Sequence, residues 1–225
     1  MSSPSPTASH SLPRILLRFF FRHFYHGFAW TYDSVAALVS LGRWNHWVRS
    51  ALPYVEGSQI LEIGHGPGHL QRSLRENQAR TVIGLDESPQ MGRIARQRLQ
   101  KAGHERVNLA RGLGQALPFQ SSLFDTVVST FPAEYIFDQQ TLHEVKRVLR
   151  PGGCFIIVPA AWIVGRKAMD RAAAWLFRAT DQVPQLPAEI FGEKLRTQLE
   201  EAGFNADVEN VQLRSSEVLI VIARA

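Results

Sequence analysis

The sequence contains a single cysteine, Cys154, so an intrachain disulfide is excluded. Cys154 lies in the apolar run CFIIV, which favours a buried structural thiol over a reactive one. A reducing, cytoplasmic location fits this cysteine usage. Metal-ligand spacing is absent as well. His65 and His69 lie four residues apart, but no third ligand accompanies them, so we expect no metal site.

The sequence also lacks an uncharged apolar run long enough to cross a bilayer. Residues 12–30 are rich in phenylalanine and leucine, but Arg14, Arg18 and Arg22 interrupt them, and the residue order of a signal peptide is missing. On a helix these arginines form one stripe, opposite leucine and phenylalanine side chains. Residues 12–28 are therefore predicted to form a basic amphipathic helix. It either packs on its own domain as part of a lid, or docks at an anionic membrane surface or over a lipid-like substrate.

Positive charge is in excess but is not concentrated. The formal net charge is +5, yet no block of consecutive lysines or arginines occurs. The basic residues are spread among helical stretches, which favours a solvated face. The segment STFPAEY, at residues 129–135, is not a motif of the Asn/Asp-Pro-Pro-Tyr type found in nucleic-acid methylation, and no basic domain is appended. We therefore do not expect a nucleic-acid partner.

Short apolar, β-branched runs alternate with helical stretches over residues 57–225. This alternation predicts an α/β domain with a Rossmann-like, mostly parallel sheet covered by helices on both faces. Too few residues separate the last two strands for a parallel crossover, so this C-terminal pair is expected to be antiparallel. Seven strands are expected, at residues 60–63, 81–85, 107–110, 124–129, 154–159, 206–213 and 218–223.

The remaining segments complete the expected organisation. Residues 1–11 are rich in serine and proline and are predicted to be a disordered tail, and residues 12–56 a helical lid or extension. A helical insertion is expected over about residues 160–187. One helix has clear start signals, with Ser88 as its N-cap and Pro89 at its first position. Helices are expected at residues 70–76, 89–102, 139–149 and 188–202.

A glycine loop, GHGPG at residues 64–68, follows the first expected strand. Its glycines permit a tight turn and let backbone amides approach a ligand closely. His69 stands where a dinucleotide fingerprint has its third glycine, so the match to a pyrophosphate site is poor. Glu62 would repel a diphosphate but could hold an ammonium group, and Asp86 could accept both hydroxyls of a ribose. A cationic ligand with a ribose and an amino-acid tail therefore fits better than NAD.

Four segments together resemble the class I S-adenosylmethionine-dependent methyltransferases, as in methyltransferase type 11 domains. ILEIGHGPG at residues 60–68 resembles the first motif of the family, and VIGLDES at 82–88 its ribose-binding strand. ALPFQSSLFDTVVS at 116–129 and RVLRPGGCFIIV at 147–158 are similar to the stretches around its fourth and fifth strands. The resemblance covers about residues 58–160. It implies S-adenosyl-L-methionine as the cofactor.

The resemblance also implies roles for the matching positions. Glu62 and the backbone of the loop would bind the methionine portion, and Asp86 would hold the ribose. Ser88 and Met91 would line the adenosine pocket, although core packing is an equally good interpretation of Met91. The implied cofactor-binding residues are Glu62, Gly64, His65, Gly66, Gly68, Asp86, Ser88, Met91, Leu113 and Gly114.

One departure from the family concerns adenine. Relatives often carry Gly-Asp-Ala before the LPF element, with the aspartate contacting the adenine amino group, whereas this sequence has Leu113 between two glycines. Backbone groups and apolar packing from Leu113 and Ala116 would then have to hold the ring. Loss of one such hydrogen bond would weaken cofactor binding by about 1–2 kcal/mol.

The methyl acceptor is less determined than the donor. Residues 130–138, TFPAEYIFD, lie where an open α/β sheet places its ligands. Phe131, Glu134 and Tyr135 are the candidate catalytic residues, and a structural role is as plausible for each. A sulfonium already activates the methyl group, so in-line positioning and exclusion of water could suffice. A base is needed only for an acceptor that holds its proton.

Residues 29–52, AWTYDSVAALVSLGRWNHWVRSAL, are similar to the leading helices of ubiquinone/menaquinone C-methyltransferases and related phospholipid N-methyltransferases. This similarity implies a small, hydrophobic or lipid- or quinone-like acceptor, with carbon, nitrogen and oxygen methylation all open. Two alternatives remain: an NAD-type nucleotide-binding oxidoreductase and a non-catalytic S-adenosylmethionine-binding protein.

Overall fold

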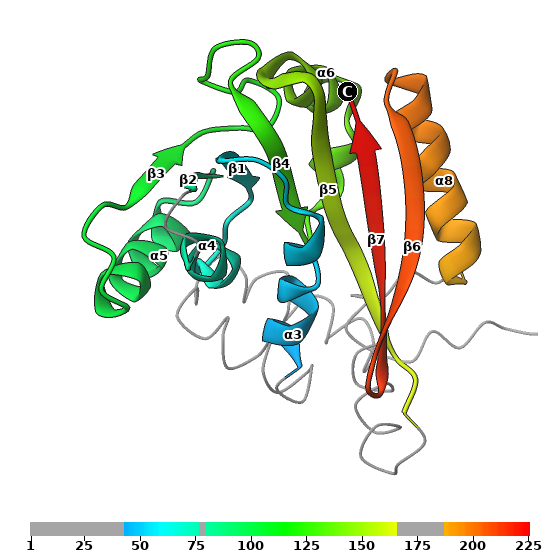
Figure 1. Ribbon diagram of the computed structural model, residues 1–225, viewed down its shortest axis with the longest axis horizontal. Coiled ribbons are helices and arrows are strands. Elements are labelled where there is room, and N and C mark those ends of the chain that lie inside the picture. The colour runs from blue at the N-terminus through cyan, green and yellow to red at the C-terminus, as the bar shows by residue number, and fades with distance from the viewer. Residues whose placement is uncertain (1–42, 77–79, 166–186) are drawn as a thin grey trace, which may run out of the picture.

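The computed structural model describes residues 43–76, 80–165 and 187–225. They form a seven-stranded sheet in the order β3-β2-β1-β4-β5-β7-β6 (Figure 1). Pairs among the first five strands of this order are parallel, and β7 is antiparallel to both β5 and β6. The predicted mostly parallel, Rossmann-like sheet with an antiparallel C-terminal pair is confirmed. The strands are β1 (Gln59–Ile63), β2 (Thr81–Asp86), β3 (Asn108–Arg111), β4 (Phe124–Thr130), β5 (Leu149–Ile163), β6 (Asn205–Leu213) and β7 (Ser216–Arg224).

Helices cover both faces of the sheet, as predicted. On one face lie α3 and α4, which share an apolar cluster with β1, β4, β5 and β7, and α5 packs beside α4 against β2 and β3. The opposite face is covered by α6 and α8, and Figure 1 shows α8 beside the edge strand β6. The helical segments are α3 (Trp44–Arg49), η2 (Leu52–Tyr54), α4 (His69–Arg75), α5 (Pro89–Lys101), η3 (Glu134–Phe137), α6 (Gln139–Val148) and α8 (Ala188–Glu201).

The alternation of side chains along β1 determines the face of the sheet on which Glu62 lies. Successive side chains of a strand point to opposite faces. Leu61 and Ile63 pack into the cluster with α6 and α8, and Ile60 packs into the cluster with α3 and α4. Glu62 therefore lies on the α4 side, where it is 1% exposed. A carboxyl group is thus placed in the interior, directly before the glycine loop.

Several local predictions are confirmed by the structure. The Ser88 side chain accepts a hydrogen bond from the Met91 amide at 3.3 Å and so caps α5, with Pro89 at the first position. Cys154 is 1% exposed, and this burial raises the pKa of its thiol to about 11. A buried, inert thiol is the result.

The expected boundary between the fifth strand and a helical insertion at residue 160 is wrong. β5 continues to Ile163 because Ala160 and Ile163 still pair with β7, opposite Leu219 and Ser216. A register shift between residues 157 and 160 accommodates Pro159, which has no amide hydrogen for the ladder. An antiparallel partner strand therefore extends a segment whose own proline predicts a stop.

Other expectations fall on residues outside the described ranges. The tail at 1–11, the basic helix at 12–28 and residues 166–186 of the expected insertion belong to these. Of the expected extension at 12–56, the structure describes α3 and η2, with Trp47 fully buried. Within residues 43–76, 80–165 and 187–225, no helix is both long and apolar enough to span a membrane.

Asp125 anchors the start of β1 to the start of β4. One of its carboxylate oxygens accepts the amides of Ser58 and Gln59, each at 2.9 Å, and the other pairs with Arg150. A Cβ on Gly57 would lie 2.3 Å from the Asp125 Cβ, and Gly57 has a φ of +71°, so glycine is required there. These bonds fix the strand that leads into the glycine loop.

We expect Asp125→Ala to lower the free energy of unfolding by about 1–3 kcal/mol, because two backbone amides lose their acceptor. Burial alone would raise the pKa of Asp125, but the amides of Gln59 and Ser58 and the Arg150 guanidinium lower it overall. The Asp125 carboxylate therefore stabilises the protein above its unfolded-state pKa of 3.8. This stabilisation is lost as the pH falls through its folded-state pKa. Urea unfolding at pH 7 and pH 3 measures this. An effect of equal size at both pH values would contradict the prediction.

Candidate functional site

The glycine loop connects β1 to α4 and folds back onto the end of β2. Gly64, Gly66 and Gly68 have φ angles of +72°, +50° and +82°, in the left-handed region that favours glycine. The Gly64 amide donates to the Leu85 carbonyl at 2.8 Å, and the Gly68 amide donates to the His65 carbonyl at 3.0 Å. α4 then begins at His69, one residue before the expected start at residue 70.

The three glycines face different surroundings. A Cβ on Gly68 would lie 2.9 Å from the Ala95 Cβ, so this glycine allows α5 to pack against the loop. A Cβ on Gly64 would lie 2.8 Å from the Tyr135 hydroxyl. Among the described residues, no atom lies within 4 Å of a Cβ placed on Gly66. Within the described part of the chain, the loop is therefore open above Gly66.

Asp86, at the end of β2, is tied to the loop. One of its carboxylate oxygens accepts the Gly66 amide at 2.8 Å, and the other accepts the Ser88 amide at 2.8 Å. Each carboxylate oxygen has a second lone pair. Asp86 thus shapes the loop and keeps acceptor capacity for hydroxyl groups of a ligand.

Glu62 is the buried acidic group of the site. Its Oε2 atom has no hydrogen-bond partner among the described residues. Burial raises the pKa of Glu62 to about 8; a hydrogen bond from Gln71 opposes this rise, Asp86 adds to it, and Arg75 opposes it more weakly. The ligand-free carboxyl is consequently protonated at neutral pH. An unpartnered oxygen in such a position has the chemistry to accept a cationic donor group.

His65 is fixed by the loop itself. It is 3% exposed, and its Nδ1 lies 2.7 Å from the Gly66 carbonyl, to which it donates. Burial lowers the pKa of the imidazole, while the charge of Asp86 raises it. A Cβ on Gly84 would lie 2.9 Å from His65 and 3.0 Å from Gln71, so this glycine makes room for both side chains. His65 therefore stiffens the loop.

The three catalytic candidates separate in space. Tyr135, on η3, lies next to Gly64 and also next to Gly114, whose Cβ would be 3.2 Å from the tyrosine ring. Phe131 packs instead on α3, with its ring centroid 4.5 Å from that of Trp44, and adopts a φ of +48° at the end of β4. Glu134 is exposed. Of the three, only Tyr135 meets the glycine loop.

Burial raises the pKa of Tyr135 to about 12, with further increases from the charges of Asp86 and Glu87. The phenol therefore keeps its proton at neutral pH. It can donate and accept hydrogen bonds, but it does not serve as a ready base.

The residues expected around adenine lie at the rim of the site. Leu113 is 48% exposed and forms a bridge with Ala116, while Gly114 is buried against Tyr135 and Thr141. Met91 is half-buried in the first turn of α5. An exposed leucine at this position offers apolar surface to a ligand. The assignment of these residues to adenine stays a prediction.

Sequence reasoning missed Gln71 and Arg75, which lie beneath the loop on α4. Gln71 is fully buried, and Arg75 donates two hydrogen bonds to its side-chain oxygen, at 3.2 and 3.3 Å. Their spacing of four residues is typical of neighbours on a helix. That spacing is the one signal in the sequence, and it does not reveal that Gln71 is buried or that both side chains lower the pKa of Glu62.

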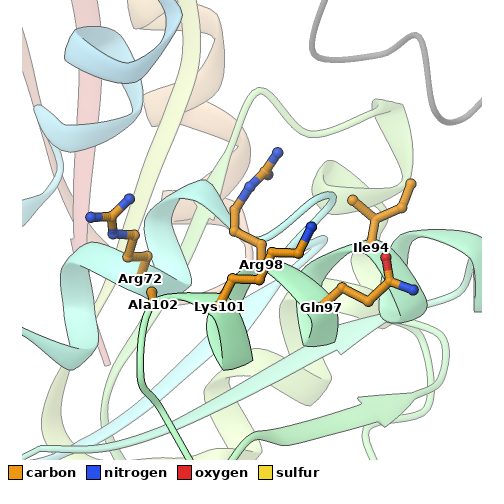
Figure 2. A pocket seen from close by; sticks show the side chains of 6 residues that line it. All are labelled: Arg72, Ile94, Gln97, Arg98, Lys101 and Ala102. Carbon is orange, nitrogen blue, oxygen red and sulfur yellow. The ribbon is translucent and has the colours of Figure 1, made fainter.

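A cavity of about 380 Å³ lies between α4 and α5, and Figure 2 shows its lining side chains. Arg98 connects it to the loop, because its guanidinium donates to the Pro67 carbonyl. The cavity contains none of the predicted site residues, so it is separate from the candidate site. Its lining residues are Arg72, Ile94, Gln97, Arg98, Lys101 and Ala102.

Comparisons with known proteins agree with this geometry. A family described as "Methyltransferase domain" matches residues 60–153. The demethylmenaquinone methyltransferase of Chlorobaculum parvum is 33% identical over 166 residues, which cover 70% of this chain and 66% of that protein. The demethylmenaquinone methyltransferase of Symbiobacterium thermophilum is 28% identical over 216 residues, 81% of this chain and 84% of that protein. The chain thus spans just under two thirds of the Chlorobaculum relative.

Among solved structures, a SAM-dependent methyltransferase from Aquifex aeolicus matches with a TM-score of 0.62. The match has 18% identity and covers 85% of this chain and 97% of that chain. At this identity the likeness concerns the fold. The arrangement of strands and helices is thus that of a known fold.

Proposed function

The chain belongs to the class I S-adenosylmethionine-dependent methyltransferases, and on this premise we propose that it transfers a methyl group to a small acceptor of hydrophobic, lipid-like or quinone-like character. One observation carries the proposal: the buried Glu62 carboxyl has an unpartnered oxygen, next to a loop that is open above Gly66. A cationic amino-acid group fits this arrangement.

The residues present fit S-adenosylmethionine. Glu62 would hold its ammonium group, and the remaining lone pairs of Asp86 would accept its ribose hydroxyls. Leu113, which is half-exposed, would cover the adenine ring in place of an acidic side chain. When bound, the donor supplies a methyl group activated by a sulfonium. The protein's own task is then to position the acceptor and exclude water.

Glu62 also bears on the NAD-type alternative. A diphosphate offers no cation to the unpartnered oxygen of the buried Glu62 carboxyl and would oppose its ionisation, so a nucleotide-binding oxidoreductase is disfavoured. Titration calorimetry of the full chain with S-adenosylmethionine and with NAD separates the two. We expect heat from the first ligand and none from the second. Binding of NAD without binding of S-adenosylmethionine would overturn the proposal.

Tyr135 is the proposed acceptor-facing residue. Its hydroxyl lies beside Gly64 and, being protonated at neutral pH, can orient an acceptor by a hydrogen bond. The packing of Phe131 on Trp44 supports a structural role for that residue, and the exposure of Glu134 gives it no closer contact with the loop. Tyr135 is therefore preferred among the three candidates.

We expect Tyr135→Phe to lower kcat/KM for the acceptor about tenfold, the value of one hydrogen bond of about 1.4 kcal/mol, with S-adenosylmethionine affinity unchanged. Steady-state kinetics combined with calorimetry measures both quantities. Tyr54→Phe is the matched control, since the Tyr54 hydroxyl bonds to Glu209 away from the loop. Equal kinetics of the two variants would remove Tyr135 from the acceptor site.

The nature of the acceptor rests on the N-terminal resemblance and on the names of the relatives, which are demethylmenaquinone methyltransferases. A methyl-donor screen across quinone precursors, phospholipids and small phenols tests it. S-adenosylmethionine binding without transfer to any of these would instead favour the non-catalytic alternative.

Contact with a membrane through residues 12–28 is part of the same proposal. The stripe of Arg14, Arg18 and Arg22 opposite apolar side chains supports it. Flotation with anionic liposomes, with the full chain and with these three arginines changed to glutamate, tests the contact. Equal flotation of both proteins would remove its basis.

A further inference from the structure

A network of polar side chains, in which Gln71 and Glu62 are buried and Arg75 is partly exposed, lies between α4 and the end of β1. Gln71 is fully buried, and its amide nitrogen donates to the Ile83 carbonyl at 3.4 Å. Arg75 donates to the side-chain oxygen of Gln71 and, at 2.6 Å, to the Val82 carbonyl. The amide nitrogen of Gln71 also lies 3.0 Å from the position of a Cβ on Gly84, the β2 residue that pairs with Glu62, and Gln71 lowers the pKa of Glu62. The side chains of Arg75 and Gln71 therefore lead from the helix to β2 beside Glu62.

The chemistry of arginine fixes the direction of this network. A guanidinium carries donors only, so the oxygen of Gln71 accepts from Arg75, and its amide nitrogen, which donates to the Ile83 carbonyl, has a second hydrogen to offer to Glu62. The glutamine thus presents a donor to one carboxyl oxygen of Glu62. The other oxygen, Oε2, is left without a partner in the described part of the chain. The carboxyl is held on one side and open on the other.

The charged groups that face Glu62 come from each element packed against it. Arg75 on α4 favours the anionic carboxylate, and Asp86 on β2 disfavours it. From the loop comes His65, whose pKa is lowered by burial. On the other neighbouring strand, β4, the residue paired with Glu62 is the uncharged Val128. Arg75 is the one cation in this set.

We propose that Gln71 and Arg75 are positioning residues that act on the methyl donor through Glu62, and that donor binding displaces the proton of the Glu62 carboxyl. The O–H bond of the carboxylic acid breaks, the proton passes to solvent, and the carboxylate pairs with the ammonium group, which keeps its own protons. The inference rests on the proposed function, because the ammonium of S-adenosylmethionine is the cation in question.

Burial is the physical reason for the displacement. An uncompensated carboxylate in the interior is costly, so the empty site keeps the proton. An arriving ammonium compensates the charge, and the carboxyl then ionises. The pKa of about 8 for ligand-free Glu62 is consistent with this order of events. Without Gln71 and Arg75, ionisation would require a higher pH.

Titration calorimetry with S-adenosylmethionine measures the proton directly. At pH 7, in two buffers of different ionisation enthalpy, we expect release of about 0.9 proton per donor bound, since a group with a pKa near 8 is mostly protonated there. Between pH 6 and 7, where the donor's amino group stays charged, the affinity should rise about tenfold. Glu62→Gln has no such proton, so its heats should be independent of the buffer.

Variants of the helix test the positioning role. Gln71→Leu and Arg75→Met are expected to weaken binding at pH 7 at least tenfold and to move the affinity profile to higher pH. Arg75→Lys keeps a cation and should restore much of the profile. Arg72→Met, on the same helix, should leave it unchanged. Circular dichroism at each pH ensures that folded proteins are compared.

The outcomes separate the inference from its premise. Absence of S-adenosylmethionine binding at every pH overturns the proposed function itself. Binding with no proton release, or with release that persists in Glu62→Gln, overturns the inference and leaves the methyl donor in place. If Gln71→Leu does not fold, proton release can still be tested by comparing the unaltered protein with Glu62→Gln. Weakened binding of Arg75→Met with an unmoved pH profile assigns Arg75 to structure alone and overturns its role.

Discussion

Replacing Gly66 with alanine is expected to leave the protein folded and to weaken S-adenosylmethionine binding at least 100-fold. A Cβ at this position meets no atom of residues 43–76, 80–165 or 187–225 within 4 Å, so the added methyl group would enter the space where the donor is proposed to lie. The φ of +50° adds a conformational cost of about 1–2 kcal/mol, which a folded domain tolerates. The loss therefore concerns the ligand far more than the fold.

Two other glycines provide controls for this prediction. Gly152 has a φ of +76° and open surroundings away from the loop, so Gly152→Ala should carry a similar conformational cost with unchanged donor binding. Gly68→Ala combines positive φ with contacts of 2.9 and 3.2 Å to Ala95, and should lower stability by about 3 kcal/mol. Urea unfolding and calorimetry give both quantities. Normal donor affinity of Gly66→Ala would contradict the placement of the donor.

Replacing Glu62 with glutamine is expected to stabilise the ligand-free protein at neutral and alkaline pH. Burial raises the pKa of this carboxyl from 4.5 to about 8 on folding. A group whose pKa is raised on folding contributes fully to stability below its unfolded-state pKa. That contribution is lost as the pH rises through its folded-state pKa. From pH 5 to pH 8 the unaltered protein should therefore lose about 3 kcal/mol relative to Glu62→Gln, which does not ionise.

Urea unfolding of both proteins at pH 5 and pH 8, without ligand, measures this difference. Glu144→Gln is a control of opposite sign, because the hydrogen bond from Arg147 lowers the pKa of Glu144 and its contribution is lost as the pH falls. A stability difference between Glu62→Gln and the unaltered protein that does not change with pH would contradict the prediction. If the prediction is confirmed, Glu62 lowers the stability of the ligand-free protein and is retained for the donor site.

Local signals explain why the core fold was predictable. The alternation of short apolar runs with helical stretches follows directly from the sheet and its covering layers. Ser88 and Pro89 mark the start of α5 because capping depends on residues a few positions apart. The glycines of residues 64–68 were recognisable because left-handed φ angles favour this residue.

The same locality explains the errors and the omissions. The end of β5 was misplaced because Pro159 predicts a stop, while β7, more than 50 residues later, supplies the partner that continues the strand. Phe131 and Tyr135 lie four residues apart, yet one packs on Trp44 and the other meets Gly64. Nothing in that short segment indicates which residue faces the loop, since contacts with distant elements decide it.

The sequence by itself determined the α/β class, the glycine loop with its acidic neighbours, and through them the methyl-donor family, because each depends on residues close together along the chain. The tertiary structure decided the state of those residues. It buried Glu62 with one oxygen unpartnered, set Gln71 and Arg75 behind it, and tied Asp86 to the Gly66 amide. These properties come from solvent exclusion and from hydrogen bonds between separate elements, which no local pattern records.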